Sequence, residues 1–169
     1  MSIKYKIGDL LEAPEMAIAH GANCQGLMGA GVAKLIRAKY PTVYSAYLAA
    51  CMDGSFRVGT AQPVLVDPAI YGSQAVVYNL GTQHFPGADA TAWGVFLSFA
   101  NMAEHAVRNG INTVATCRVG SGIGGLNFDR DVVPGIEEAL ARSNHPGLDI
   151  VVYDLFPVEG TTYDLPVGA

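Results

Sequence analysis

The feature that most constrains the fold is a regular alternation of short apolar runs with segments of helical period. The apolar runs, which predict buried strands, are Ile3–Ile7, Met16–His20, Ala61–Val66, Ala75–Leu80, Thr113–Cys117 and Ile150–Leu155. Between them, apolar residues recur with a helical period over 32–36, 43–51, 93–107 and 132–140. Strands that are apolar along most of their length are typical of sheets covered on both faces. The pattern therefore predicts an α/β fold, a three-layer α/β/α sandwich with a mixed, largely parallel central sheet.

The composition predicts one domain. Of the 169 residues, 50% are hydrophobic and 15% are charged, which is enough apolar material for one sizeable core. We expect a single domain over residues 1–156 and a C-terminal tail over 157–169, where Gly, Thr and Pro replace the apolar pattern. The cysteines Cys24, Cys51 and Cys117 are scattered and form no CxxC pair, which disfavours a disulfide framework or a thiolate zinc site.

Charge and hydropathy exclude several classes of partner. A formal net charge of −5 argues against a broad duplex-binding surface, and Lys34, Arg37 and Lys39 are expected on a solvated helix face. The N-terminal residues lack the apolar region of a signal peptide, and no apolar run reaches the roughly 20 residues that span a bilayer. We therefore expect a cytoplasmic monomer with no membrane partner.

Two glycine-rich loops follow predicted strands. The first runs from His20 to Val32 and carries Gly26, Gly29 and Gly31 immediately before a helical segment. The second spans Gly120–Leu126. Glycines let the backbone approach a ligand closely, and unpaired N–H groups in such loops and at helix starts bind anions. The two loops together predict a clamp for phosphate groups.

Other interpretations of these glycines are weaker. Gly120, Gly122 and Gly125 satisfy the GxGxxG pattern of dinucleotide-binding folds, but the βαβ unit with an acidic residue about 20 positions further on is not evident. Neither loop contains the Gly-Lys-Ser/Thr of a P-loop. For each loop taken alone, the alternative is that its glycines only turn the chain.

Four motifs together resemble the macrodomain family of ADP-ribose-binding modules. They are Gly8-Asp9-Leu10, the segment from Ala19 to Ala33, Tyr78–Thr82 and Gly120–Leu126, and the resemblance extends from Gly8 to about Leu155. The spacing of His20 from Met28-Gly29-Ala30-Gly31 resembles the branch that includes the terminal ADP-ribose protein glycohydrolase, the DNA ADP-ribosyl glycohydrolase antitoxins and the yeast-type ADP-ribose 1″-phosphate phosphatases. The resemblance implies ADP-ribose or ADP-ribose 1″-phosphate as ligand. We expect no cofactor and no metal.

The resemblance also implies binding residues. Asp9 would accept a hydrogen bond from the adenine amino group, with the Leu10 backbone beside it, and Phe156 is a candidate to flank the adenine ring. The loop around the distal ribose and phosphate would be Gly29, Ala30, Gly31 and Val32, and the diphosphate loop would be Ser121, Gly122, Ile123 and Gly124. The alternative roles are a helix N-cap for Asp9 and a core position for Phe156.

Two residues are candidates for catalysis. Asn23 matches the position that faces the distal ribose, although Asn in such a loop also tolerates left-handed backbone. His20, expected to end its strand at the mouth of the cleft, matches the histidine of the yeast-type phosphatases. Its imidazole could act as a general base or acid, and the alternative is a hydrogen bond to neighbouring backbone.

The sequence departs from the glycohydrolases of this branch at two positions. Their lysine nucleophile would fall in Thr82–Phe85, which contains no lysine, and Gly124 stands where their aspartate would fall. The covalent route through a lysine is therefore not available. We rank a phosphatase first, a non-catalytic ADP-ribose reader or scavenger second, and a glycohydrolase using substrate-assisted attack of water third.

The remaining titratable residues carry weaker signals. His84 and Asp89 lie in the Gln83–Thr91 loop and are further candidates without supporting spacing. His105 and His145 are expected at the surface, because neither has a metal-like partner nearby in the sequence. Cys24 is expected to be a packed thiol rather than a nucleophile. An ADP-ribosylated macromolecule or nucleic acid as partner is not indicated.

Overall fold

The chain folds around one mixed, largely parallel sheet, as predicted. The computed structural model describes residues 2–142 and 147–164. Over these residues the strands are β1 (Ser2–Ile7), β2 (Ala17–Ala22), β3 (Ala61–Leu65), β4 (Val76–Gly81), β5 (Thr113–Thr116) and β6 (Asp149–Asp154). Their order across the sheet is β1-β6-β5-β2-β4-β3, and each pairing is parallel except that of β3 with β4.

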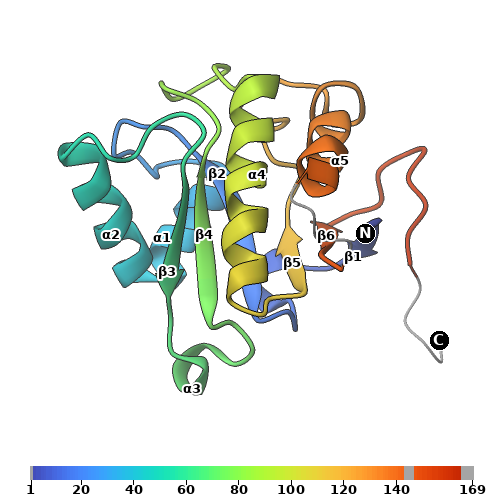
Figure 1. Cartoon of the computed structure of the whole chain (residues 1–169), viewed down its shortest axis with the longest axis horizontal. Helices are drawn as coiled ribbons and strands as arrows, with labels where there is room; N and C mark the ends of the chain where they lie inside the picture. Colours follow the sequence, from blue (N-terminus) through green and yellow to red (C-terminus); the bar gives the residue numbers. More distant parts are fainter. Residues whose placement is uncertain (1, 143–146, 165–169) are drawn as a thin grey trace.

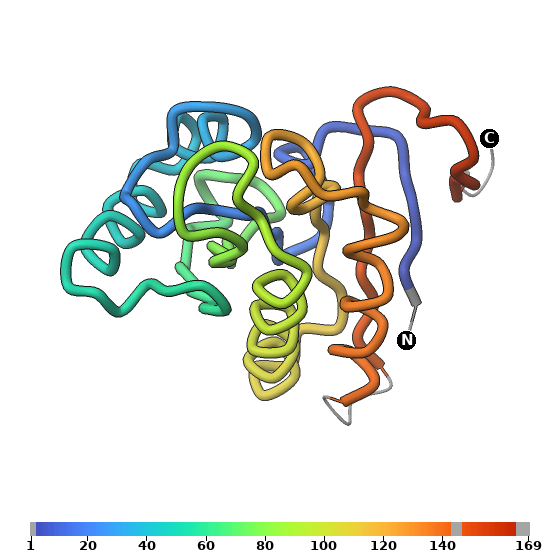
Figure 2. The backbone as a smooth tube through the Cα atoms, turned by 90° about the horizontal axis from the view of Figure 1, so that it is seen from above, coloured from blue at the N-terminus to red at the C-terminus, as the bar shows by residue number. Residues whose placement is uncertain are grey.

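Helices cover the two faces of this sheet. On one face lie α1 (Gly31–Lys39) and α2 (Pro41–Met52), and on the other lie α4 (Ala92–Arg108), α5 (Val133–Arg142) and the π-helical turn η2 (Phe128–Val132) (Figures 1 and 2). The short elements η1 (Leu10–Glu12) and α3 (Pro68–Tyr71) follow β1 and β3. The predicted α/β/α sandwich is therefore confirmed.

The core forms on both faces because the side chains of a strand alternate. In β2, Ala17 and Ala19 pack into the cluster that contains Phe99 of α4, whereas Ile18 between them packs against Ile36 of α1. All of these residues are fully buried. Successive residues of a strand point to opposite faces, so a strand covered on both sides must be apolar throughout.

Two predicted strands differ in detail from the observed ones. The strand predicted over Ala61–Val66 forms the edge of the sheet and runs antiparallel to β4. Its residues are mostly half-buried, so it is not covered on both faces. Its Pro63 has no N–H to donate to a sheet, which is why such a strand occupies an edge. The strand predicted to end at His20 continues to Ala22, because parallel pairing with β4 extends that far.

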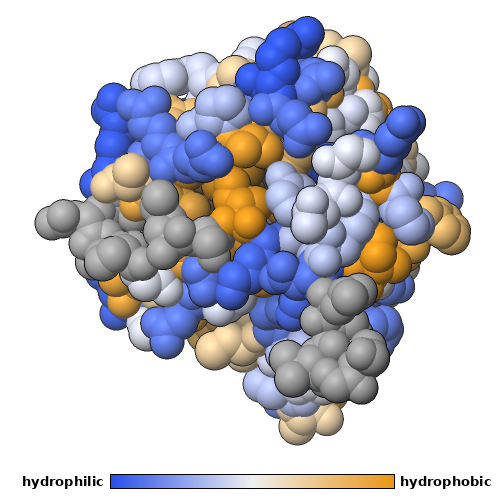
Figure 3. Space-filling model, turned by 90° about the vertical axis from the view of Figure 1, so that its right-hand side faces the viewer, coloured by the Kyte–Doolittle hydropathy of each residue, from blue (hydrophilic) through white to orange (hydrophobic). Residues whose placement is uncertain are grey.

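Part of the expected C-terminal tail is fastened to the domain. The Tyr163 hydroxyl donates to Asp154 Oδ2 (2.7 Å), and the Asp164 amide donates to the Tyr5 carbonyl (2.8 Å). Residues 165–169 of that tail lie outside the described residues. The side of the molecule that carries β1 and β6 is largely hydrophilic around a central apolar area (Figure 3).

Candidate functional site

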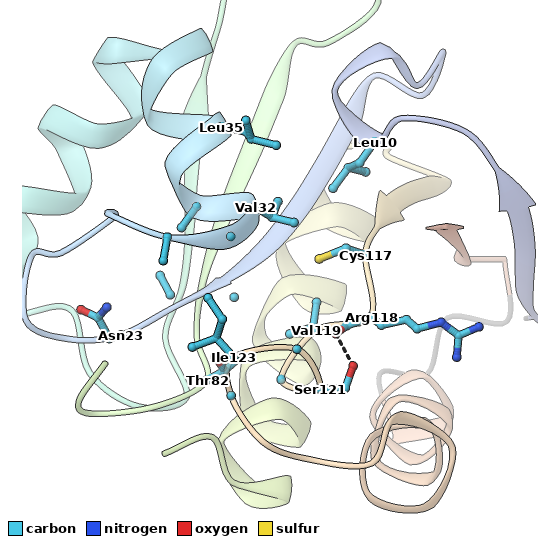
Figure 4. A pocket seen from close by; sticks show the side chains of 18 of the residues that line it. Leu10, Asn23, Val32, Leu35, Thr82, Cys117, Arg118, Val119, Ser121 and Ile123 are labelled. Carbon is cyan, nitrogen blue, oxygen red and sulfur yellow. Dashed lines mark hydrogen bonds between the residues drawn. The ribbon is translucent and has the colours of Figure 1, made fainter. Parts of the chain in front are cut away.

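A cavity of about 690 Å³ lies at the carboxyl ends of β2, β5 and β6. It is the place where an open parallel sheet binds its ligands. Asn23 and all the binding residues predicted above except Phe156 line it: Asp9, Leu10, Gly29, Ala30, Gly31, Val32, Ser121, Gly122, Ile123 and Gly124. The labelled side chains come from several loops around one hollow (Figure 4). The structure thus brings these residues together, and their contact with a ligand stays a prediction.

The first glycine loop ends at the amino terminus of α1. Its N-cap, Ala30, has no side chain that can accept a hydrogen bond, and the first turn of the helix carries no acidic residue. The backbone amides of Gly31, Val32 and Ala33 have no partner among the described residues. Gly31 has φ +59°, a conformation that favours glycine. The helix start therefore offers unpaired N–H groups and its positive dipole end to the cavity.

The second glycine loop offers another set of amides. The hydroxyl and amide of Ser121 both donate to the Arg118 carbonyl, at 2.6 and 3.2 Å, and these bonds fold the loop back on itself. In the part of the chain that the structure describes, the amides of Gly122, Ile123 and Gly124 have no acceptor. Consecutive free amides of this kind form a nest for anions.

The two glycine loops approach each other across the cavity. A Cβ atom placed on Gly31 would lie 3.3 Å from Cδ1 of Ile123, so the Ile123 side chain reaches over to the start of α1. On the other side of its loop, Gly124 is closely packed: a Cβ atom there would lie 2.6 Å from the Gly120 carbonyl oxygen and 2.9 Å from Cβ of Ala90. The loop conformation therefore requires glycine at 124.

Asp9 marks one end of the cavity. Its Oδ1 accepts from the Leu11 amide (3.0 Å), which confirms the N-cap interpretation. Its Oδ2 has no hydrogen bond among the described residues, and the side chain is exposed. The apolar side chains of Leu10, Val32 and Leu35 gather at this end (Figure 4). The capping hydrogen bond uses one carboxylate oxygen of Asp9, so the other can accept a hydrogen bond beside this apolar surface.

Asn23 is held in place by its own loop. Its Nδ2 donates to the Leu27 carbonyl (2.8 Å), and its Oδ1 accepts from the Gln25 amide (2.9 Å) and the Tyr47 hydroxyl (2.8 Å). An amide has two N–H groups, so one stays available for a ligand. Asn23 can orient a hydroxyl group, but an amide cannot act as a base.

The expectation that His20 lies at the mouth of the cleft is wrong. His20 sits inside β2, is 0% exposed and is not among the residues that line the cavity. Its Nε2 lies 2.6 Å from Oδ1 of Asn79 on β4, and its Nδ1 has no partner among the described residues. Burial lowers the pKa of His20 to about 4. Because β2 continues to Ala22, the ring is enclosed between strands and lacks access to a substrate.

Sequence reasoning missed several residues of the cavity wall. They lie at or just after the carboxyl ends of β4, β5 and β6 and include Thr82, Gln83, Cys117, Arg118, Tyr153 and Asp154. Strand order was the signal that could have found them, since parallel neighbours end at the same edge. Burial raises the pKa of the Cys117 thiol to about 11, so it is a neutral wall residue.

The other candidates take structural roles. Asp89 Oδ2 accepts the amides of His84 (3.1 Å) and Phe85 (2.9 Å), which fixes the loop after β4. The Cys24 thiol donates to the Gln83 carbonyl, and burial raises its pKa to about 11, in agreement with a packed thiol. Phe156 is 79% exposed and does not line the cavity.

The two remaining histidines, His105 and His145, were both expected at the surface. His105 is half-buried rather than on the surface, with Nδ1 2.8 Å from the Tyr78 hydroxyl. His145 lies outside the described residues.

A second cavity, of about 780 Å³, lies beside β1. Its charged side chains include Lys4 and Lys6, which pair with Asp149 and Glu15 at 3.9 Å each. None of the described residues that line it is a glycine. Among the described residues there is no group of three or more His, Cys, Asp or Glu that could hold a metal ion, and no helix there is both long and apolar enough to cross a bilayer.

Comparison with known proteins identifies the family. The Macro domain family model matches residues 19–132, more than half of the chain. The chain therefore belongs to the macrodomain family. The macrodomain of Thermus aquaticus DarG superposes with a TM-score of 0.78 at 26% identity, over 90% of this chain and 97% of that one. That of Mycobacterium tuberculosis DarG gives a TM-score of 0.75 at 27% identity, over 89% and 96%.

Curated relatives carry two enzymatic names. The DNA ADP-ribosyl glycohydrolase of Mycobacterium tuberculosis is 28% identical over 151 residues, which are 89% of this chain and 42% of that protein. The chain thus spans less than half the length of this relative. The ADP-ribose 1″-phosphate phosphatase of Aspergillus oryzae is 43% identical over 56 residues, which are 32% of this chain and 28% of that protein.

The close packing at Gly124 generates a stability prediction. We expect Gly124→Ala to lower the free energy of unfolding by about 1–3 kcal/mol, because the added methyl group meets backbone that must shift. Gly122→Ala in the same loop is the matched control, since a Cβ there meets nothing within 4 Å. Urea unfolding of the three proteins measures the difference. Equal stabilities of the two variants would contradict the described loop conformation.

The buried His20 generates a pH prediction. Because the folded pKa of about 4 lies below the ordinary value of 6.5, the unfolded chain binds the proton more readily. The free energy of unfolding should therefore fall as the pH drops from about 6.5 to 4, by about 3 kcal/mol from this group. His20→Gln removes the titrating ring and should flatten this part of the curve. Urea unfolding across this range tests it, and identical slopes in both proteins would refute the assignment.

Proposed function

We propose that this macrodomain binds ADP-ribose or a derivative such as ADP-ribose 1″-phosphate in the cavity between its two glycine loops. The proposal rests on two sets of backbone amides that have no hydrogen-bond partner among the described residues and line one cavity. They are the amides of Gly31–Ala33 and Gly122–Gly124. A diphosphate presents adjacent anionic groups that such amides can share. Arg118 is the one cationic residue in the described cavity wall, so backbone amides would supply most of the donors.

The Asp9 end of the cavity supports an adenine-containing ligand. A purine needs apolar surface for its faces, which Leu10, Val32 and Leu35 provide. Its exocyclic amine is a donor, and the open Oδ2 of Asp9 is an acceptor beside that surface. The same cavity is lined by Gly8 and Asp9 and by Asn23 and Gln83, so one extended ligand would contact both groups.

The named relatives support the same ligand class. One is called a DNA ADP-ribosyl glycohydrolase and the other an ADP-ribose 1″-phosphate phosphatase, and both names refer to an ADP-ribosyl group. The shared chemistry supports ADP-ribose recognition more directly than it supports either reaction. This cavity would hold the ADP-ribosyl group of a free nucleotide or of a modified macromolecule.

Binding now ranks above phosphate hydrolysis, which reverses the order favoured by the sequence. The candidate base, His20, is buried and neutral. A glycohydrolase of the lysine type lacks its nucleophile in Thr82–Phe85, and the loop geometry at Gly124 leaves no room for an aspartate side chain. Of the two carboxylates in the described cavity wall, Asp154 is paired with Arg118 and Asp9 lies at the proposed adenine end, so neither is placed as a base for the terminal phosphate.

A phosphatase is the second candidate. The observation in its favour is the 43% identity with the Aspergillus oryzae phosphatase over 56 residues. In this chain such an enzyme would orient the terminal phosphate and an attacking water by Asn23 and backbone amides, with no contact to the imidazole of His20. A glycohydrolase using substrate-assisted attack of water is the third.

Calorimetric titration with ADP-ribose tests the proposed binding. We expect the wild type to bind, and Asp9→Asn to weaken binding about tenfold, since the amide replaces an anionic acceptor. Asn is as good an N-cap as Asp, so this variant keeps the η1 turn and separates the ligand role of Asp9 from its capping role. Absence of binding by the wild type at millimolar ADP-ribose would overturn the proposal. Equal affinity of Asp9→Asn would refute the adenine contact.

Incubation with ADP-ribose 1″-phosphate separates binding from catalysis. We expect the substrate to persist over hours with excess protein, because His20 is buried and neither carboxylate of the described cavity wall is placed as a base for the terminal phosphate. Chromatography of substrate and ADP-ribose is the measurement, with a protein-free control. Conversion by the wild type would establish the phosphatase instead. His20→Gln, assayed in parallel, would then show whether the buried ring takes part.

A further inference from the structure

Arg118 and Asp154 form a partly buried ion pair beside the cavity. Nε and Nη2 of Arg118 donate to the two carboxylate oxygens of Asp154, at 2.8 Å each. Their side chains are 17% and 8% exposed. The guanidinium also lies 5.5 Å from the Tyr5 ring centre and 5.3 Å from that of Phe128. A bidentate pair is geometrically specific, and the two rings add cation–π contacts to the guanidinium.

The backbone of the same two residues supports both rims of the cavity. The Asp154 carbonyl accepts from the Gly8 amide (2.8 Å), which precedes Asp9. The Arg118 carbonyl accepts both hydrogen bonds of Ser121, which directly precedes the free amides of Gly122–Gly124. A displacement of the ion pair would therefore move the Asp9 rim and the Ser121 rim together.

The ion pair is in turn held by the segment 158–164. Thr161 Oγ1 accepts from Nη2 of Arg118 (2.9 Å), and the Tyr163 hydroxyl donates to Asp154 Oδ2 (2.7 Å). The same hydroxyl accepts from the Val158 amide (2.9 Å), so the segment closes on itself over the pair. Figure 1 shows this segment folding back after β6, near β1 and away from the helices α1 and α2.

We propose that Arg118 and Asp154 are positioning residues of the cavity and that segment 158–164 sets their geometry. The Arg118 guanidinium points away from the hollow between the glycine loops (Figure 4), so it acts through its backbone and not by touching a ligand. Docking of the segment and occupancy of the cavity are then coupled, because both require the same arrangement of the two rims. This coupling rests on the proposed binding of ADP-ribose, whereas the positioning role does not.

Hydrogen exchange tests the positioning role without a ligand. Thr161→Val combined with Tyr163→Phe removes two hydroxyl groups and keeps the shapes of the side chains. We expect the Gly8 and Ser121 amides to exchange about tenfold faster in this double variant, while Tyr78 in β4 is unchanged. Thr162→Val is the matched control, since Thr162 is exposed and makes no hydrogen bond among the described residues. Unchanged exchange at Gly8 and Ser121, or an equal increase at Tyr78, would overturn the proposal.

Titration of the same proteins with ADP-ribose tests the coupling. We expect the double variant to bind about three- to tenfold more weakly than the wild type and Thr162→Val to match the wild type. Faster exchange at the rims with unchanged affinity would overturn the coupling. If the wild type itself does not bind, the proposed function fails, and the exchange comparison still decides whether segment 158–164 positions the rims.

Discussion

Parallel pairing of β2 with β5 is the constraint on which the cavity depends. The register places Ala17 beside Val114 and Ala19 beside Thr116, so both strands reach the same edge of the sheet side by side. The Thr116 hydroxyl adds a hydrogen bond to the Ala19 carbonyl (2.9 Å) at this edge. Each strand continues into a glycine loop, and the two loops therefore face each other across one hollow. A shift of one residue would turn every side chain of β2 to the opposite face.

The site is built mainly from backbone, and this explains its composition. Unpaired amides at the start of α1 and in the 122–124 loop provide the donors, so the sequence there must supply small residues rather than cations. A chain with a formal charge of −5 can bind an anionic nucleotide in this way, because oriented amides act at short range. Gly124 shows how strict the requirement is, since even a methyl group would meet the Gly120 carbonyl.

The family resemblance implied the convergence of Asp9 with the two glycine loops. The sandwich and the glycine loops themselves could be predicted from the residues. These depend on hydrophobic period and on turn chemistry, which are local signals. The buried position of His20 could not be predicted, because it depends on β2 pairing with β4 for two residues beyond the end of the apolar run. The role proposed for Arg118 was also hidden, since its partner Asp154 is 36 residues away and Tyr163, whose hydroxyl donates to Asp154, lies in a segment of unpatterned composition.

Chemical-shift mapping of backbone amides during titration with ADP-ribose tests the central claim most directly. The account predicts the largest changes in two sets of residues, 31–33 and 122–124, with Asp9 shifting in the same titration. Lys4 and Lys6 of the second cavity beside β1 should not respond. Changes confined to that second cavity, or none at the two glycine loops when the ligand is in excess, would contradict the account.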